Sequence, residues 1–228
     1  MILSGHAPSY LPWLGQFEKI ARSDVFVFHD TAQFERKGFM NRNRIKTPQG
    51  ALWLTVPVDL RGYLERELRE IEVREELGWR QLHWSSICYN YRRAPHFADY
   101  ADELEALYAR PWRHLSELNL ELIRFGLRAL EIDTRILLTS EIPGISGRKS
   151  DFVLSVCLNL GADAYYCGAQ GRSYLRAEDF EAAGVEVIFQ EYRHPEYPQR
   201  FGGFLPGMSF LDLLLNAGPQ SRALCLGD

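Results

Sequence analysis

Apolar residues at the start of the chain follow first a strand pattern, then a helical one, then a strand pattern again. The short apolar run Met1–Gly5 is compatible with a buried strand, whereas Leu14, Phe17 and Ile20 recur at helical spacing. Aromatic and β-branched residues in Asp24–Phe28 predict a second strand. Strand, helix and strand within about 30 residues form a βαβ unit, so the two strands should be parallel.

The last third of the chain alternates in the same way. Glycines stand directly after the predicted helices at Gly161, Gly184 and Gly218, where a helix commonly ends. Alternating strands and helices are typical of the α/β class, so we predict a Rossmann-like three-layer sandwich with a mainly parallel sheet. The predicted strands are Thr134–Leu138, Ala162–Cys167 and Val185–Gln190, and the predicted helices are Lys149–Leu160, Glu178–Ala183 and Ser209–Asn216.

The middle of the chain has a different character. Asp30–Gln49 fits neither period, so we predict a long loop there, which in a compact domain is usually functional. A strand at Leu52–Val58 and a further one at Glu67–Val73 follow. The block from about 30 to 111 is therefore predicted as an inserted loop, strand and helical subdomain within a single α/β domain, 1–228. Helices are expected at Trp79–Tyr91, His96–Tyr108 and Leu115–Leu130.

Composition narrows the function. Of the 228 residues, 46% are hydrophobic and the net charge is −4, which argues against bulk nucleic-acid binding. The four cysteines form no CxxC pair, and metal-site spacing such as HExxH is absent, so we expect no metal site and a reduced, cytoplasmic setting. No basic, apolar leader opens the chain, and no apolar run is long enough for a membrane span.

Ligands of open α/β sheets bind beyond the carboxyl ends of the strands, so the loops after the predicted strands are the first candidates. His6 follows the first strand and could act as an acid, a base or a phosphate partner; the alternative is that the prolines and Trp13 around it only shape a packed turn. Asp30 follows the second strand and could orient a base, or could only cap local backbone. We assign catalysis to His6 and Asp30.

Several further residues are candidate substrate contacts. Arginines in the segment after Asp30 could hold a phosphate or carboxylate, although a solvated basic loop is the alternative. Aromatic residues could stack on a sugar or base; they also supply part of a composition that is 13% aromatic. These candidates are Tyr10, Trp13, Gln33, Asn41, Arg42, Arg44, Tyr174 and His194.

Two glycine-containing loops precede predicted helices. Gly144–Ser150 contains Ser146 and Lys149 and could hold an anion, but it is not a P-loop because Arg148 stands where the second glycine is required. Gly168 and Gly171 could let a ligand approach the backbone, or could form a tight turn; the GxGxxG fingerprint is absent.

An ordered set of motifs runs through the chain. The motifs are His6–Gly15, Ser23–Asp30 with Gln33-Phe34, Asn41–Asn43, Trp53–Pro57, Asn90-Tyr91, Ala94-Pro95, Leu160–Asp163 with Gly168, Gln190 with His194-Pro195, and Asp212–Asn216 with Gly218. Together they resemble the WbqC-like protein family, and the resemblance covers nearly the whole chain. It implies a bacterial or archaeal protein of surface-polysaccharide or O-antigen biosynthesis, acting on sugars such as nucleotide-linked amino sugars. Arg148–Ser150 and Cys167 depart from the family pattern.

Three functions follow from these observations. The leading hypothesis is an enzyme that transfers an acyl or aminoacyl group to an amino sugar or other amine, with His6 deprotonating the amine. The second is an ATP-dependent ligase or nucleotidyl transferase, because the start of the chain is also similar to nucleotidylyltransferase folds, although the second histidine of their usual pair is missing. The third is a non-catalytic carbohydrate or nucleotide-sugar binding module. No cofactor is assigned beyond a nucleotide or nucleotide-sugar, and the expected partner is an anionic or sugar-linked small molecule.

Overall fold

The computed structural model describes residues 1–227, and contacts divide them into two compact units. Unit 1 comprises residues 1–7, 18–31 and 132–193; unit 2 comprises residues 8–17, 32–131 and 194 to the end of the described chain. The single domain with an inserted subdomain stays a prediction.

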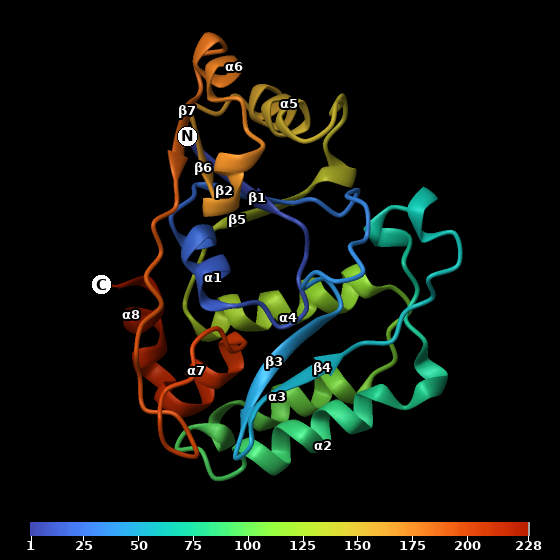
Figure 1. Ribbon diagram of the computed structural model, residues 1–228, viewed down its shortest axis with the longest axis vertical. Helices are drawn as coiled ribbons and strands as arrows, with labels where there is room; N and C mark the ends of the chain where they lie inside the picture. Colours follow the sequence, from blue (N-terminus) through green and yellow to red (C-terminus); the bar gives the residue numbers. More distant parts are fainter. Residues whose placement is uncertain (228) are drawn as a thin grey trace. The chain divides into compact units, whose positions relative to one another are not determined.

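Unit 1 is built on a five-stranded sheet in which every pair of neighbours is parallel (Figure 1). The strand order is β5-β2-β1-β6-β7. Helices flank the sheet, which confirms the predicted α/β, Rossmann-like class. The strands are β1 (Ile2–His6), β2 (Val25–Phe28), β5 (Arg135–Leu138), β6 (Ala164–Cys167) and β7 (Glu186–Phe189).

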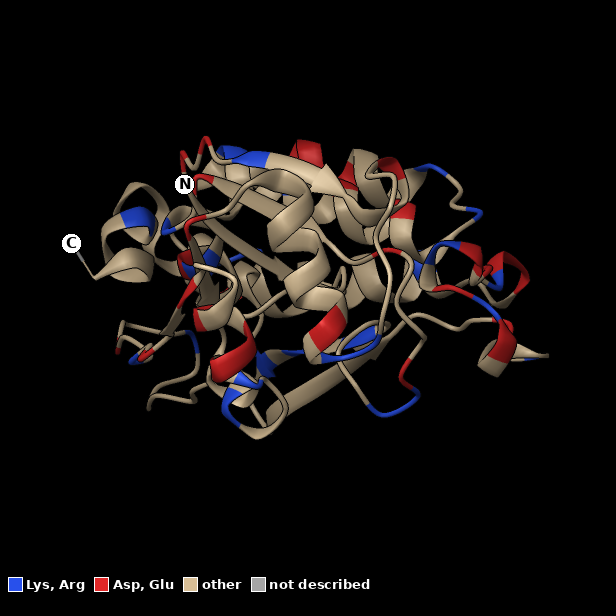
Figure 2. Cartoon of the chain, turned by 90° about the horizontal axis from the view of Figure 1, so that it is seen from above, with Lys and Arg blue, Asp and Glu red and all other residues tan. Residues whose placement is uncertain are grey.

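The core of unit 1 lies between the sheet and the helices α5 (Ser150–Leu160) and α6 (Ala177–Ala182). Leu3 and Val25 of the sheet are buried in the same cluster as Phe180 of α6. The three central strands contain no Lys, Arg, Asp or Glu, while each edge strand begins with a charged residue. Figure 2 shows the charges concentrated in the surrounding helices and loops. Charges at exposed strand edges are a common protection against edge-to-edge pairing.

Helix α1 (Leu14–Ala21) connects β1 to β2 and contains the residues predicted to be helical from their spacing. An amphipathic helix would expose its polar face, but here seven of the eight residues are buried, with only Ala21 partly exposed. Glu18 and Lys19 are therefore buried charged residues, a placement that requires partners for both.

Unit 2 contains an antiparallel hairpin and a set of helices. The hairpin packs on helices α2 and α7, and α2 packs on α3. The predicted helices in this part of the chain are all confirmed within one residue at each end. The elements are β3 (Arg42–Thr47), β4 (Gly50–Thr55), α2 (Trp79–Tyr91), α3 (Phe97–Ala109), α4 (Leu115–Ala129), α7 (Phe210–Ala217) and α8 (Ser221–Leu226).

Three element predictions are wrong. Part of the predicted loop 30–49 is strand β3, whose charged side chains alternate with Asn43, Ile45 and Thr47; the polar Asn43 and Thr47 hide that alternation in the sequence. The predicted strand Glu67–Val73 contains a 3₁₀ turn, Leu68–Glu70, with isolated bridges on either side of it. Helix α8 follows the 3₁₀ turn Gly218–Gln220 and was not among the predicted helices.

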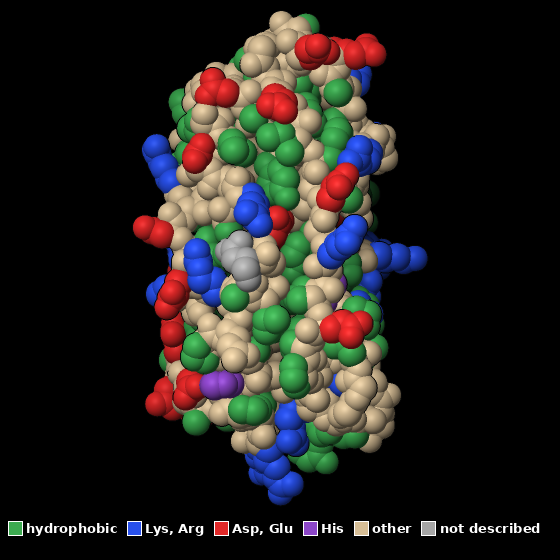
Figure 3. Space-filling model, turned by 90° about the vertical axis from the view of Figure 1, so that its left-hand side faces the viewer, with side chains coloured by type: hydrophobic (Ala, Val, Ile, Leu, Met, Phe, Trp, Pro, Cys, Tyr) green, Lys and Arg blue, Asp and Glu red, His purple; other side chains and the backbone are tan. Residues whose placement is uncertain are grey.

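The surface carries charges of both signs. On the face that Figure 3 shows, acidic and basic side chains are interspersed. None of the helices in the described residues is both long enough and apolar enough to span a membrane.

One buried carboxylate joins distant segments of unit 2. Asp212 of α7 has no exposed surface and accepts hydrogen bonds from Tyr91 Oη at 2.6 Å, Tyr197 Oη at 2.9 Å and Gln199 Nε2 at 2.6 Å. Tyr91 in turn accepts a bond from the backbone N–H of Lys46 in β3. The carboxylate thus connects α2, the hairpin and the segment before α7.

We expect Asp212→Ala to destabilise the protein strongly, by about 3 kcal/mol or more, because three buried donors lose their acceptor. Urea unfolding of the variant measures the change in the free energy of unfolding. Asp102→Ala, at an exposed position of α3, is the control and should change stability by less than about 0.5 kcal/mol. Equal stability of both variants would contradict the assigned role of Asp212.

Candidate functional site

The order of the strands in unit 1 reverses between β1 and β6. From β1 the chain proceeds outward through β2 to β5, and then resumes on the other side with β6 and β7. In open α/β sheets the ligand site lies at such a switch point, beyond the carboxyl ends of the two strands. Here those ends are Gly5 and His6 of β1, and Cys167 of β6 with Gly168 directly after it.

A buried lysine reaches this point from α1. Lys19 is only 5% exposed, and its Nζ donates a hydrogen bond to the carbonyl oxygen of Gly5 at 2.8 Å. The same Nζ lies 5.5 Å from the centre of the Phe26 ring. An ammonium has three donors, and the described residues give this one a single acceptor. Lys19 therefore keeps hydrogen-bonding capacity for a ligand.

The environment of Lys19 also changes its protonation. Burial lowers the pKa of Lys19 to about 8, because a charged ammonium loses its hydration; nearby Cys167 and Glu18 oppose this shift. The Glu18 carboxylate is itself satisfied, since it accepts bonds from Gln190 Nε2 at 2.6 Å and Tyr166 Oη at 3.1 Å. Lys19 is thus charged at neutral pH and loses that charge within a pH range in which ordinary lysines keep it.

Gly168 leaves space beside Lys19. Its φ of −61° is open to any residue, so the backbone does not require glycine. A Cβ at this position would lie 3.8 Å from Lys19 Nζ and 3.9 Å from Gln190 Oε1, in ordinary contact. A longer side chain would extend into the neighbourhood of both groups. The missing side chain therefore allows a ligand to approach the ammonium.

Two histidines flank the same strand end. His6 Nδ1 lies 2.7 Å from the carbonyl oxygen of Ala7, which can only accept, so Nδ1 carries the proton and Nε2 the lone pair. The His29 ring lies so close to Gly5 that a Cβ there would be 2.3 Å from its Nε2. Gly5 is thus required for space, and His6, Lys19 and His29 surround it.

Both histidines are neutral at pH 7. The His6 side chain is exposed, yet the surrounding protein desolvates it and, with the charge of Lys19, lowers its pKa to about 4. Burial, with the charges of His6 and Lys19, lowers the pKa of His29 to about 3. Neutral His6 can accept a proton at Nε2.

Asp30 does not stand free at the end of β2. Its carboxylate is 3% exposed and accepts bonds from Thr139 Oγ1 at 2.8 Å, from the Ser140 backbone N–H at 3.0 Å and from Ser140 Oγ at 2.6 Å. These bonds fix the turn after β5 to the end of β2. The predicted orientation of a catalytic base by Asp30 stays a prediction.

The other predicted residues of unit 1 lie on two loops. Ser146 and Lys149 are exposed, on the loop before α5, where Lys149 has a φ of 52°. Gly171 is buried, and the space beside it admits only glycine because a Cβ there would lie 2.0 Å from Cys167 Sγ. Tyr174 is 40% exposed, and its hydroxyl is hydrogen-bonded to Cys167; burial raises the pKa of Tyr174 to about 12. These two positions follow β6, as does Gly168.

Unit 2 contains the remaining predicted residues. Tyr10 is fully buried, with its hydroxyl 2.7 Å from His83 Nδ1 and 2.6 Å from Tyr108 Oη, so it has no surface for a ligand. Trp13 is 42% exposed and its ring covers Gly15. Two predicted residues bind backbone carbonyls through their side-chain amides. Gln33 Nε2 donates to the Leu64 carbonyl, and Asn41 Nδ2 donates to the Val56 carbonyl.

Two predicted residues of unit 2, Arg44 and His194, meet at Gly207. Arg44 Nη2 donates to the Gly207 carbonyl at 2.9 Å, and the Gly207 N–H donates to His194 Nε2 at 3.3 Å. Arg42 lies on the same strand as Arg44, two residues earlier, and both guanidinium groups lie over the ring of Trp53.

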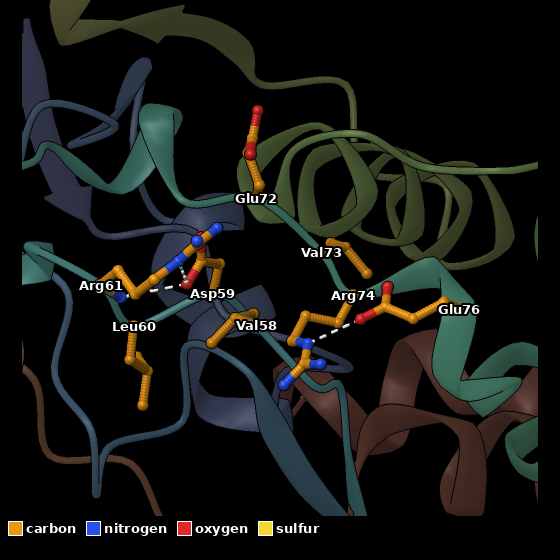
Figure 4. A pocket seen from close by; sticks show the side chains of 8 residues that line it. All are labelled: Val58, Asp59, Leu60, Arg61, Glu72, Val73, Arg74 and Glu76. Carbon is orange, nitrogen blue, oxygen red and sulfur yellow. Dashed lines mark hydrogen bonds and ion pairs between the residues drawn. The ribbon is translucent and has the colours of Figure 1, made fainter.

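An open groove of about 820 Å³ also lies in unit 2. Figure 4 shows that its charged side chains pair with one another, Arg61 with Asp59 and Arg74 with Glu76. Glu72, the remaining charged residue of the lining, pairs with Arg113, which is not a lining residue. None of the predicted site residues lines the groove. The lining residues are Val58, Asp59, Leu60, Arg61, Glu72, Val73, Arg74 and Glu76.

Sequence reasoning missed Lys19, Glu18 and His29. On a helical wheel Lys19 lies opposite the apolar stripe of its helix, where a charged residue is expected in solvent, so no periodicity marks it as buried. His29 directly follows the second strand and was included in its loop without a role. Its position directly after a predicted strand could have marked His29 as a candidate site residue. No feature of the sequence marks Lys19 as one.

Comparison with known proteins places the chain in a family. The model of the WbqC-like protein family matches residues 7–224. The uncharacterized protein Rv1507c of Mycobacterium tuberculosis is 35% identical over 215 residues, which cover 93% of this chain and 92% of that protein. No solved structure matches. The chain therefore belongs to the WbqC-like protein family.

Proposed function

We propose that the protein is an enzyme that binds an anionic small molecule at the switch point of unit 1 and transfers an acyl or aminoacyl group to its amine. The proposed substrate class is an amino sugar carrying a phosphate or nucleotide, as expected for surface-polysaccharide biosynthesis. The observation that carries the proposal is Lys19, a buried ammonium with a single acceptor at the end of β1.

Lys19 supports the anionic half of the substrate class. A buried cation is costly unless an opposite charge or several acceptors compensate it, and an incoming phosphate or carboxylate would supply both. The absence of a side chain at Gly168 supports approach from the β6 side. Ligand binding in the crevice between β1 and β6 also follows the general rule for this sheet order.

His6 supports the transfer step. The substrate amine attacks the carbonyl carbon of an activated acyl donor, and a C–N bond forms. The bond between that carbon and the donor's leaving group breaks, and the leaving group departs with the electron pair. The proton released by the amine passes to Nε2 of neutral His6, and from there to solvent or to the leaving group. Asp30 is proposed to fix the end of β2, where His29 lies, rather than to touch substrate.

A nucleotide-dependent reaction is the second candidate. The strand order of unit 1, with its reversal beside the first strand, favours it because phosphates of bound nucleotides occupy this position in related open sheets. In that case Lys19 would contact the nucleotide phosphates, and the enzyme would join an acid and an amine at the expense of ATP.

Lys19→Met should weaken binding of a UDP-linked amino sugar by roughly tenfold or more, because a charge-assisted hydrogen bond is lost. Isothermal titration calorimetry at pH 7 measures the affinity. Arg92→Met is the control, since Arg92 is an exposed cation remote in sequence from the predicted site residues, and it should bind as the unmodified protein does. Equal affinity of the Lys19→Met and Arg92→Met variants would contradict the proposed anion site.

His6→Ala should reduce turnover by about 10²-fold or more while leaving substrate affinity nearly unchanged, because the variant lacks the proton acceptor. Acyl thioesters and aminoacyl adenylates are the donors to be offered with the same acceptor, and mass spectrometry detects the product. Near-normal turnover in His6→Ala would exclude His6 as the base.

Millimolar Mg-ATP tests the second candidate. A rise in Tm that is smaller in Lys19→Met would favour nucleotide-dependent chemistry, because a ligand that binds only the folded state stabilises it more as its concentration rises above its Kd. An unchanged Tm would count against this candidate and leave the acyl donor as the activated species.

A further inference from the structure

The hairpin of unit 2 presents two arginines and a tryptophan on one face. Arg42 and Arg44 alternate with the buried Asn43 and Ile45, and Arg44 is the cross-strand partner of Trp53. The guanidinium carbons lie 4.6 and 5.5 Å from the centre of the Trp53 ring, for Arg42 and Arg44 respectively. The two cations are therefore within about 10 Å of each other, close to the Debye length at physiological salt.

No carboxylate neutralises this pair. Within residues 1–227, neither Arg42 nor Arg44 forms a salt bridge; both instead donate to backbone carbonyls, Arg42 to those of Lys37 and Gly38 and Arg44 to that of Gly207. The surrounding sequence, residues 36–58, contains five basic residues and no acidic one, in a protein whose net charge is −4. The carbonyls fix the guanidinium groups in place, and the charge remains uncompensated.

Exposed aromatic surface adjoins the two cations. Trp53 is 43% exposed and Phe39 is 49% exposed, and their rings lie 5.9 Å apart. Two adjacent exposed rings form a continuous aromatic surface rather than isolated exposed side chains, and tryptophan stacks on both sugars and bases. Guanidinium groups in fixed positions suit the paired oxygens of a phosphate.

We propose that this hairpin face is a separate binding site for a phosphate ester whose organic part is a ring, with the phosphate on Arg42 and Arg44 and the ring on Trp53 and Phe39. The ring could be a sugar or a base, and both sources share this chemistry. The site lies wholly in unit 2, so it does not depend on the function proposed for unit 1.

The test uses the Lys19→Met protein, in which binding at the proposed unit 1 site is weakened. ADP, glucose 1-phosphate and inorganic pyrophosphate are titrated by calorimetry, and tryptophan fluorescence is followed in parallel. We expect at least one ring-bearing phosphate to bind more tightly than pyrophosphate and to change the fluorescence, with the signal lost in Trp53→Phe. If neither ADP nor glucose 1-phosphate binds, or if pyrophosphate binds equally well, the proposal is overturned.

Arg42→Gln/Arg44→Gln should weaken the ring-bearing phosphate by roughly tenfold or more, because both charge-assisted contacts are removed. Arg110→Gln is the matched control: Arg110 also stacks on an indole, 3.7 Å from the centre of Trp112, but that ring is buried and offers no surface. Arg42→Lys/Arg44→Lys keeps the charge, should retain part of the affinity, and serves if the glutamine variant fails to fold. The proposal is overturned if the glutamine variant binds the ring-bearing phosphate with unchanged affinity. It is also overturned if the lysine variant binds as tightly as Arg110→Gln does.

Discussion

The proposed unit 1 site depends on one interaction, the hydrogen bond from the Lys19 ammonium to the carbonyl oxygen of Gly5. It carries a buried positive charge from α1 to the carboxyl end of β1, where the strand order reverses. Desolvation destabilises the charged form of Lys19 and lowers its pKa. An anion bound beside the ammonium would therefore stabilise that charged form.

The residues around this charge are arranged by close packing. Gly5 has no side chain because the His29 ring occupies that space, and Gly168 leaves the other side of Lys19 open. Glu18, which could have neutralised Lys19 directly, is instead satisfied by Gln190 and Tyr166. The same packing keeps His6 neutral, so a proton acceptor stands beside a cation, a combination suited to binding an anion that carries an amine.

Much of the fold could be predicted from sequence, and the centre of the site could not. Apolar periodicity locates α1 and the five parallel strands, and the strand-end rule identifies His6 and Gly168. The position of Lys19 is lost because its helix is buried on nearly every side, which a one-sided apolar stripe cannot reveal. Strand β3 is missed because Arg42, Arg44 and the buried Lys46 share one face and the other face includes Asn43, so neither face is plainly apolar.

A measured pKa of Lys19 would show whether its ammonium is desolvated at the end of β1 and responds to a bound anion. The chain has four lysines, at positions 19, 37, 46 and 149, so selective ¹³C labelling resolves their side-chain signals by NMR. We expect one lysine signal to titrate near pH 8 and to be absent in Lys19→Met. Its titration midpoint should move to higher pH when a UDP-linked amino sugar is added, because a bound anion favours the charged form. A Lys19 signal that titrates near 10.4, as exposed lysines do, and does not respond to the ligand would contradict this expectation.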